Sequence, residues 1–86
     1  MGDVLPVRVL VQDTWDEVRL AVPSSTPVGV LKATALRQAG VVEGAEGFVA
    51  KFRGALLDDE DRSLAEVGMV PNVAVIVMPR RRRPVR

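Results

Sequence analysis

The chain of 86 residues contains no cysteine and no histidine. These absences exclude disulfides, thiolate metal sites and the Ser–His and Cys–His forms of nucleophilic catalysis. The sequence also lacks an apolar run long enough to span a membrane, and its first residues lack the basic and apolar regions of a secretion signal. We therefore expect a cytoplasmic protein with no enzymatic activity, no cofactor and no metal.

Aromatic residues are also scarce: the sequence has only Trp15, Phe48 and Phe52. Hydrophobic residues nevertheless make up 48% of the chain, so a core of valine, leucine, isoleucine and alanine is available. Valine is abundant, and β-branched residues favour strands. A chain of this length forms one compact domain.

The net charge of +1 combines two regions of opposite sign. Residues 1–79 carry seven basic and eleven acidic side chains, a net charge of −4, whereas residues 80–86 add five arginines and no acid. Pro79 ends the patterned part of the sequence. We therefore expect one domain over residues 1–79 and a basic, disordered tail over residues 80–86.

The spacing of apolar residues predicts the secondary structure. Alternation over 5–11 and 15–22, joined by a short polar turn, predicts a β-hairpin. Residues 28–39 have the spacing of an amphipathic helix. Further strands are predicted over 48–53, 55–57 and 73–78, and the last is apolar on both faces, which indicates a central position. This order predicts an α+β fold with a mixed four- or five-stranded sheet packed on one main helix.

Polar residues and glycines mark the ends of the helical segments. We expect Thr26 to cap the main helix, with Pro27 in its first position, and Gly40 to close it. Ser63 and Glu66 have the spacing of a capping box, which predicts one further helical turn.

The order of these elements is that of the ubiquitin-like β-grasp superfamily, and several segments resemble this family more closely. They are Pro23-Ser24-Ser25-Thr26 at the helix start, Phe52-Arg53-Gly54-Ala55-Leu56-Leu57-Asp58-Asp59 followed by Arg62-Ser63-Leu64, and Met69, Val75 and Val77. The resemblance covers about residues 5 to 78. It implies a β-grasp fold whose exposed sheet face docks partner proteins.

A second resemblance is weaker. The high valine content and the run Val22-Pro23…Thr26-Pro27-Val28 are similar to the small ubiquitin-like proteins and domains of bacterial type VII secretion systems.

Two features depart from the ubiquitin-like pattern. Conjugated members of the family end in Gly-Gly, whereas this chain ends Arg83-Pro84-Val85-Arg86, so we expect that it is not conjugated. The surface isoleucine of ubiquitin's third strand is replaced by Lys51, so the partners of ubiquitin should not be assigned to this chain.

The acidic run 58–61 has the composition of a solvated loop rather than of a catalytic or metal site. Catalytic carboxylate pairs need a cleft that separates and desolvates them, and the alternating ligands of a calcium loop are absent. We therefore expect no catalytic residue, no cofactor-binding residue and no small-molecule substrate.

The two-residue period of the strands predicts which side chains face away from the helix. This outward set is Arg8, Leu10, Trp15, Glu17, Arg19, Lys51, Arg53, Ile76 and Met78. Within it, Leu10, Trp15, Lys51, Ile76 and Met78 are the predicted partner-binding residues, because an apolar patch with a polar rim marks an interaction site. Association between two copies and the absence of any role remain alternatives, as does packing of Trp15 over the hairpin end.

The leading hypothesis is a non-enzymatic ubiquitin-like protein-binding module or adaptor. The alternatives are a subunit of a secretion-type assembly, a modifier conjugated after processing, and a weak binder of nucleic acid or an anionic surface. That last function would use the tail residues Arg80, Arg81, Arg82, Arg83 and Arg86. The tail has no aromatic residue on which bases could stack, so such binding would be independent of base sequence.

The tail hypothesis predicts a steep dependence on salt. Each phosphate that an arginine neutralises lowers the slope of log K against log salt by about 0.7 to 0.9, and five arginines set the upper limit. Binding to a single-stranded oligonucleotide, measured by fluorescence anisotropy, should be weak at low salt, should fade towards physiological salt, and should disappear when the tail is deleted. Binding that survives the deletion would place the site on the domain.

Overall fold

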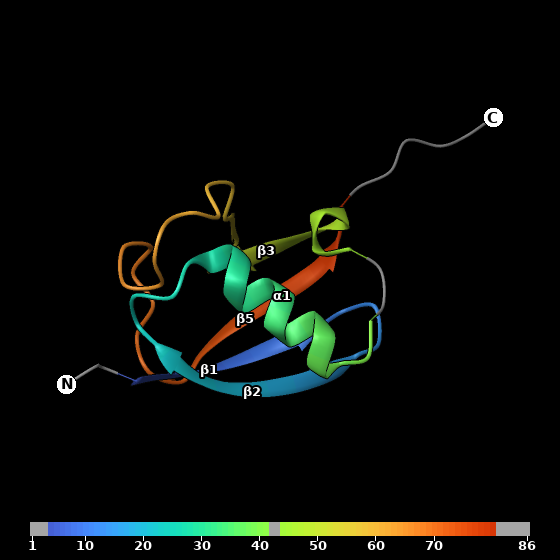
Figure 1. Cartoon of the computed structure of the whole chain (residues 1–86), viewed down its shortest axis with the longest axis horizontal. Helices are drawn as coiled ribbons and strands as arrows, with labels where there is room; N and C mark the ends of the chain where they lie inside the picture. The colour runs from blue at the N-terminus through green and yellow to red at the C-terminus, as the bar shows by residue number, and fades with distance from the viewer. Residues whose placement is uncertain (1–3, 42–43, 81–86) are drawn as a thin grey trace.

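The computed structural model describes residues 4–41 and 44–80, and these form a sheet with a helix across one face (Figure 1). The strands are β1 (Val4–Val11), β2 (Asp16–Pro23), β3 (Phe48–Phe52), β4 (Ala55–Leu56) and β5 (Val73–Pro79). The helix α1 spans Val28–Gln38, and a single 3-10 turn, η1, spans Ala45–Gly47. This is the predicted α+β fold, with the predicted boundaries shifted by one residue or so. No helix in the described ranges is long and apolar enough to cross a membrane.

The strand order in the sheet is β2-β1-β5-β3-β4. The β1–β2 hairpin is antiparallel, β1 and β5 pair in parallel, and β3 is antiparallel to both β5 and β4. The last strand therefore occupies the centre of the sheet, as its apolar character predicts.

The alternation of each strand directs one set of side chains towards α1. On β5, Val75 and Val77 are 0% and 1% exposed, whereas Ile76 between them is 38% exposed. The buried set also includes Val7, Val9 and Val11 of β1, Val18 and Leu20 of β2, and Phe48, Ala50 and Phe52 of β3. These residues close against Val28, Leu31, Ala35 and Leu36 of α1. The period of two thus fixes which face of the sheet is buried.

The start of α1 differs from the prediction. Pro27, rather than Thr26, occupies the N-cap position, and no side chain caps the helix. Instead, the backbone N–H groups of Val28 and Gly29 donate to the carbonyl oxygens of Arg62 and Glu60, both at 2.9 Å. These are two of the first-turn donors that have no partner within a helix. The loop after β4 therefore caps the helix with its own backbone.

The predictions for the end of α1 at Gly40 and for the capping box at Ser63 agree better with the structure. Gly40 has a φ of +83°, and the N–H groups of Gly40 and Val41 donate to the carbonyls of Arg37 and Leu36, which is a Schellman closure. Ser63 and Glu66 form the reciprocal capping-box hydrogen bonds, at 3.0 and 3.1 Å. The chain after Ser63 makes a single hydrogen-bonded turn there rather than a helix.

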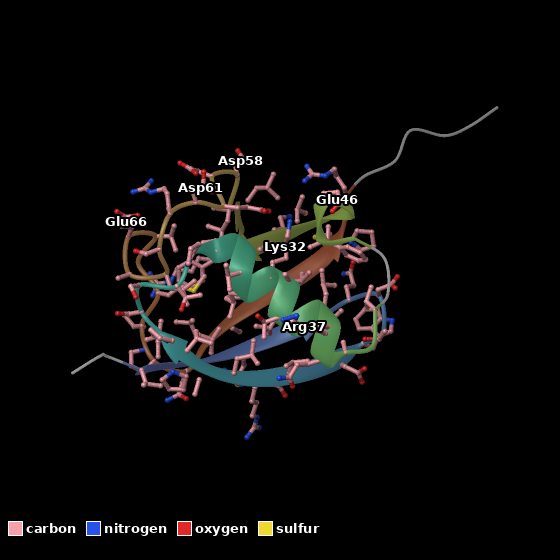
Figure 2. The ribbon with its side chains drawn as sticks, viewed as in Figure 1. Lys32, Arg37, Glu46, Asp58, Asp61 and Glu66 are labelled. Carbon is pink, nitrogen blue, oxygen red and sulfur yellow. The ribbon has the colours of Figure 1, made fainter. Side chains whose placement is uncertain are left out.

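The charged side chain of Lys32 lies inside the molecule, between α1, β3 and the loop after β4 (Figure 2). Lys32 is 2% exposed, and its Nζ donates to Glu60 Oε2 at 2.6 Å and to the carbonyl oxygen of Phe48 at 2.9 Å. Gly29 leaves room for this approach, because a Cβ there would lie 3.2 Å from Glu60 Cβ. Lys32 therefore fastens the loop and β3 to the helix.

This arrangement predicts that Glu60→Gln destabilises the fold. The change leaves the buried Lys32 ammonium with neutral acceptors and no counter-charge, and removing one partner of a buried ion pair is strongly unfavourable. Because Glu60 is partly exposed, we expect a loss of about 2 kcal/mol in the free energy of unfolding, measured by chemical denaturation. Asp58→Asn in the same loop is the control, and the double variant Lys32→Met/Glu60→Gln should recover most of the loss. A change in Glu60→Gln as small as in the control would contradict this role.

Candidate docking surface

The sheet face opposite α1 carries a continuous row of side chains from five strands. Leu10 pairs in register with Glu17 on one side and with Ile76 on the other. Ile76 then pairs with Lys51, which in turn pairs with Leu56 of β4. Three of the five predicted partner-binding residues, Leu10, Ile76 and Lys51, are therefore direct neighbours across the sheet.

The apolar members of this surface are exposed to different degrees. Ile76 is 38% exposed and Leu56 is 46% exposed, while Leu10 and Met78 are half-buried. Met78 pairs with Val49 of β3, which is also half-buried. The apolar area thus extends over β1, β5, β3 and β4.

The structure adds a hollow to this surface at its β3–β5 side. It has a volume of about 540 Å³, and it is lined by Val49, Lys51, Leu56, Met78, Pro79 and Arg80. Sequence reasoning missed Val49 and Leu56. Val49 lies two positions before Lys51, so strand parity alone could have found it. Leu56 could not be assigned to a face before its pairing with Lys51 was known.

Arg80 belongs to the folded part of the chain rather than to a free tail. Its backbone N–H donates to the carbonyl oxygen of Gly47 at 2.8 Å, and its Nε donates to that of Glu46 at 3.1 Å. Arg80, which the predicted tail includes, therefore contacts the domain, so a tail deletion should begin after it, and the rest of the tail prediction stays a prediction. The other predicted anion-binding arginines, Arg81, Arg82, Arg83 and Arg86, lie outside the described residues.

Trp15 does not pack over the hairpin end. It lies in the turn between β1 and β2, where it is 70% exposed and has a φ of 59°. Gln12, three residues before Trp15 in the same turn, donates its N–H to the carbonyl oxygen of Val77, so this turn lies at the end of β5 beside Met78. A bulky residue with positive φ is strained, and such strain motivates a functional hypothesis.

Two other predicted outward residues make local contacts. The guanidinium of Arg53 stacks over the ring of Phe52, with 5.2 Å between Cζ and the ring centroid. Arg8 lies 3.8 Å from Glu17, and both side chains are about half exposed.

The acidic side chains of the loop lie away from β1 and β2, on the rim beside β3 (Figure 2). Asp59 Oδ1 accepts the backbone N–H of Asp61 at 3.2 Å, and Glu60 pairs with Lys32. Across residues 4–41 and 44–80, no group of three acidic side chains is placed to hold a metal ion. These carboxylates shape the loop and its attachment to the helix.

Comparisons with solved structures agree with this architecture. The fold matches ubiquitin from Caldiarchaeum subterraneum with a TM-score of 0.79 and 11% identity, over 92% of this chain and 96% of that one. It matches a protein described as a molecular mimic of SUMO that promotes DNA repair with a TM-score of 0.78 and 16% identity, over 90% and 92%. A ubiquitin-like domain from Arabidopsis thaliana matches with a TM-score of 0.71 and 19% identity, over 96% and 84%.

These matches show that the chain has the ubiquitin-like β-grasp fold, as its sequence predicts. No protein-family model and no curated protein sequence matches it. The weaker resemblance to type VII secretion proteins stays a prediction.

The geometry of Trp15 predicts that Trp15→Asn stabilises the fold. Positive φ is unfavourable for a tryptophan by about 1–2 kcal/mol, whereas asparagine tolerates it, and an exposed side chain contributes little packing. We expect the free energy of unfolding to rise by about 0.5–1 kcal/mol. Circular dichroism is the measurement, since Trp15 is the only tryptophan and fluorescence would lose its reporter. Trp15→Phe keeps the backbone strain and should leave the free energy of unfolding unchanged. A less stable Trp15→Asn variant would mean that the indole packs on the hairpin.

Proposed function

We propose that this chain is a non-enzymatic ubiquitin-like module that binds another protein through the face of the sheet opposite α1. In this role it acts as an adaptor or as a subunit of a larger assembly. The observation that carries the proposal is the continuous apolar area around Ile76. It lies on the central strand and borders a hollow of about 540 Å³.

The position of this area favours a protein as the partner. Contiguous apolar patches with a polar rim are typical of protein–protein contacts. Here the rim contains Lys51, Glu17 and Arg80, while Leu10, Ile76 and Met78 form the centre. The hollow beside Met78 is open to an aliphatic or aromatic side chain of the partner, and such anchors dominate binding energy.

The turn that carries Trp15 lies at one end of the proposed surface, beside the end of β5. An exposed tryptophan in a strained conformation stabilises nothing in the isolated domain, whereas tryptophan is among the residues most often dominant at interfaces. We therefore include it with the predicted partner-binding residues. The absence of cysteine is consistent with work in a reducing compartment such as the cytoplasm.

The test of this proposal is Ile76→Asp. An outward residue shifts stability little, so the domain should stay folded, with a change of about 1 kcal/mol or less. A carboxylate at the centre of an apolar contact would be desolvated without a partner, so capture of the bound protein from source cells should be lost. Captured proteins are quantified by mass spectrometry against the wild-type chain.

Two variants control this test. Val30→Asp places the same carboxylate at an exposed valine on α1, where the valine is 51% exposed, and should leave capture unchanged. Val75→Asp, at a fully buried position of the same strand, should unfold the domain. Equal capture by the Ile76→Asp and Val30→Asp variants would remove the sheet face from the binding function.

A further inference from the structure

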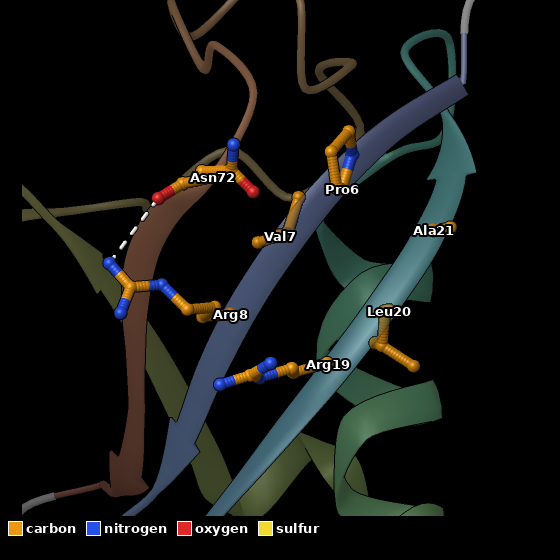
Figure 3. A pocket seen from close by; sticks show the side chains of 7 residues that line it. All are labelled: Pro6, Val7, Arg8, Arg19, Leu20, Ala21 and Asn72. Carbon is orange, nitrogen blue, oxygen red and sulfur yellow. Dashed lines mark hydrogen bonds between the residues drawn. The ribbon is translucent and has the colours of Figure 1, made fainter.

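The outer face carries a second hollow, at its β1–β2 side, that the apolar area does not include (Figure 3). Its volume is about 390 Å³, and Pro6, Val7, Arg8, Arg19, Leu20, Ala21 and Asn72 line it. Arg8 and Arg19 are directly opposite each other in the register of the antiparallel pair. Both side chains extend the same way across the sheet, from their own strands towards β5 (Figure 3).

Small residues leave this space open. Pro6 pairs with Ala21 next to the two arginines, and Arg8 pairs with Ala74 on β5. None of these three side chains is long enough to cover the guanidinium groups.

Among residues 4–41 and 44–80, the two positive charges lack sufficient compensation. Like charges directly opposite each other on neighbouring strands are destabilising. Arg8 has only the 3.8 Å contact with half-exposed Glu17 and a 3.4 Å hydrogen bond from its Nη2 to the carbonyl oxygen of Asn72. Arg19 forms no ion pair or side-chain hydrogen bond with another residue in the described ranges. One carboxylate among these side chains leaves a net positive charge in the hollow.

We propose that Arg8 and Arg19 bind a carboxylate side chain of the partner protein, and this inference rests on the proposed docking face. Guanidinium groups present donors in a planar fork that matches a carboxylate, and such charge-assisted hydrogen bonds are stronger than neutral ones. The contacts of Arg8 with Asn72 and Glu17 hold its side chain over the sheet, while Arg19 supplies the free donors. A bound carboxylate would lie between the two groups and cancel their repulsion.

The neighbouring apolar area favours a protein over a nucleic acid as the source of this anion. Successive outward positions on a strand are about 7 Å apart, so Arg8 lies that far from Leu10. A partner segment that carries an aliphatic side chain and an acidic one two residues apart in an extended chain would fill both sites. A phosphate backbone would neutralise the arginines but would leave Leu10 and Ile76 uncovered.

The experiment is an NMR titration of the isotope-labelled full chain with two peptides. The first, acetyl-LSESLSE-amide, alternates leucine and glutamate on one side of an extended chain, and the second, acetyl-LSQSLSQ-amide, replaces each acid by its amide. At low salt we expect the acidic peptide to bind about five-fold more tightly and to shift the signals of Arg8 and Arg19. The difference should shrink as salt is added, because the charges are exposed.

Three variants distinguish this proposal from the docking face itself. Arg19→Gln should abolish the difference between the two peptides, whereas Arg37→Gln, on the exposed side of α1, should preserve it. Ile76→Asp should weaken the binding of both peptides. Equal binding of the peptides to the wild-type chain, lost in Ile76→Asp, would overturn the arginine site and leave the docking face intact. Failure of the acidic peptide to shift Arg8 and Arg19 at millimolar concentration would also overturn the arginine site.

Two further measurements complete the test. A short oligothymidylate that shifts Arg8 and Arg19 more strongly than the acidic peptide would assign the site to phosphate and overturn the proposal. Without any ligand, Arg19→Gln should raise Tm at low salt by about 2 °C, since it removes the repulsion. A lower Tm would mean that Arg19 stabilises the domain itself, which is contrary to the proposal.

Discussion

The packing of one helix against a five-stranded sheet determines which side chains of this domain are buried and which are exposed. The α1 helix covers one sheet face, and the aliphatic side chains of alternate strand positions close against it. Because the core contains two aromatic residues, Phe48 and Phe52, its packing depends on many small contributions rather than on a few large ones. The second face has no helix across it in the described residues, so its outward side chains, such as Ile76, stay exposed to solvent.

Much of this arrangement could be predicted from the sequence because it depends on the regular spacing of apolar residues along each strand and helix. Alternation along β5 places Ile76 outside and Val75 and Val77 inside, and the apolar character of that strand indicates its central position. The glycine at position 40 and the capping-box pair Ser63 and Glu66 also behave as their local chemistry predicts. Each of these inferences needs only residues that are near one another in the chain.

The features that could not be predicted join segments that are distant in the sequence. The backbone of the loop caps α1 through Glu60 and Arg62, which no pattern around Thr26 indicates. The partner of Lys32 and the two hollows of the outer face likewise depend on strand register and on which small residues become neighbours. The arginine run that begins at Arg80 predicts a tail from that residue, whereas Arg80 donates hydrogen bonds to the carbonyl oxygens of Glu46 and Gly47.

The parallel pairing of β1 with β5 also determines when the domain can form during synthesis. Val9 and Val75 are partners in register although they are 66 positions apart in the sequence. Until β5 has left the ribosome, β1 and β3 have no strand between them, and the apolar side of α1 has no complete surface to cover. Contacts of such long separation slow folding, because closing the loop costs entropy before the contact stabilises anything. The nascent chain therefore exposes its aliphatic strands until β5 is made, and chaperones that bind such strands have access to them up to that point.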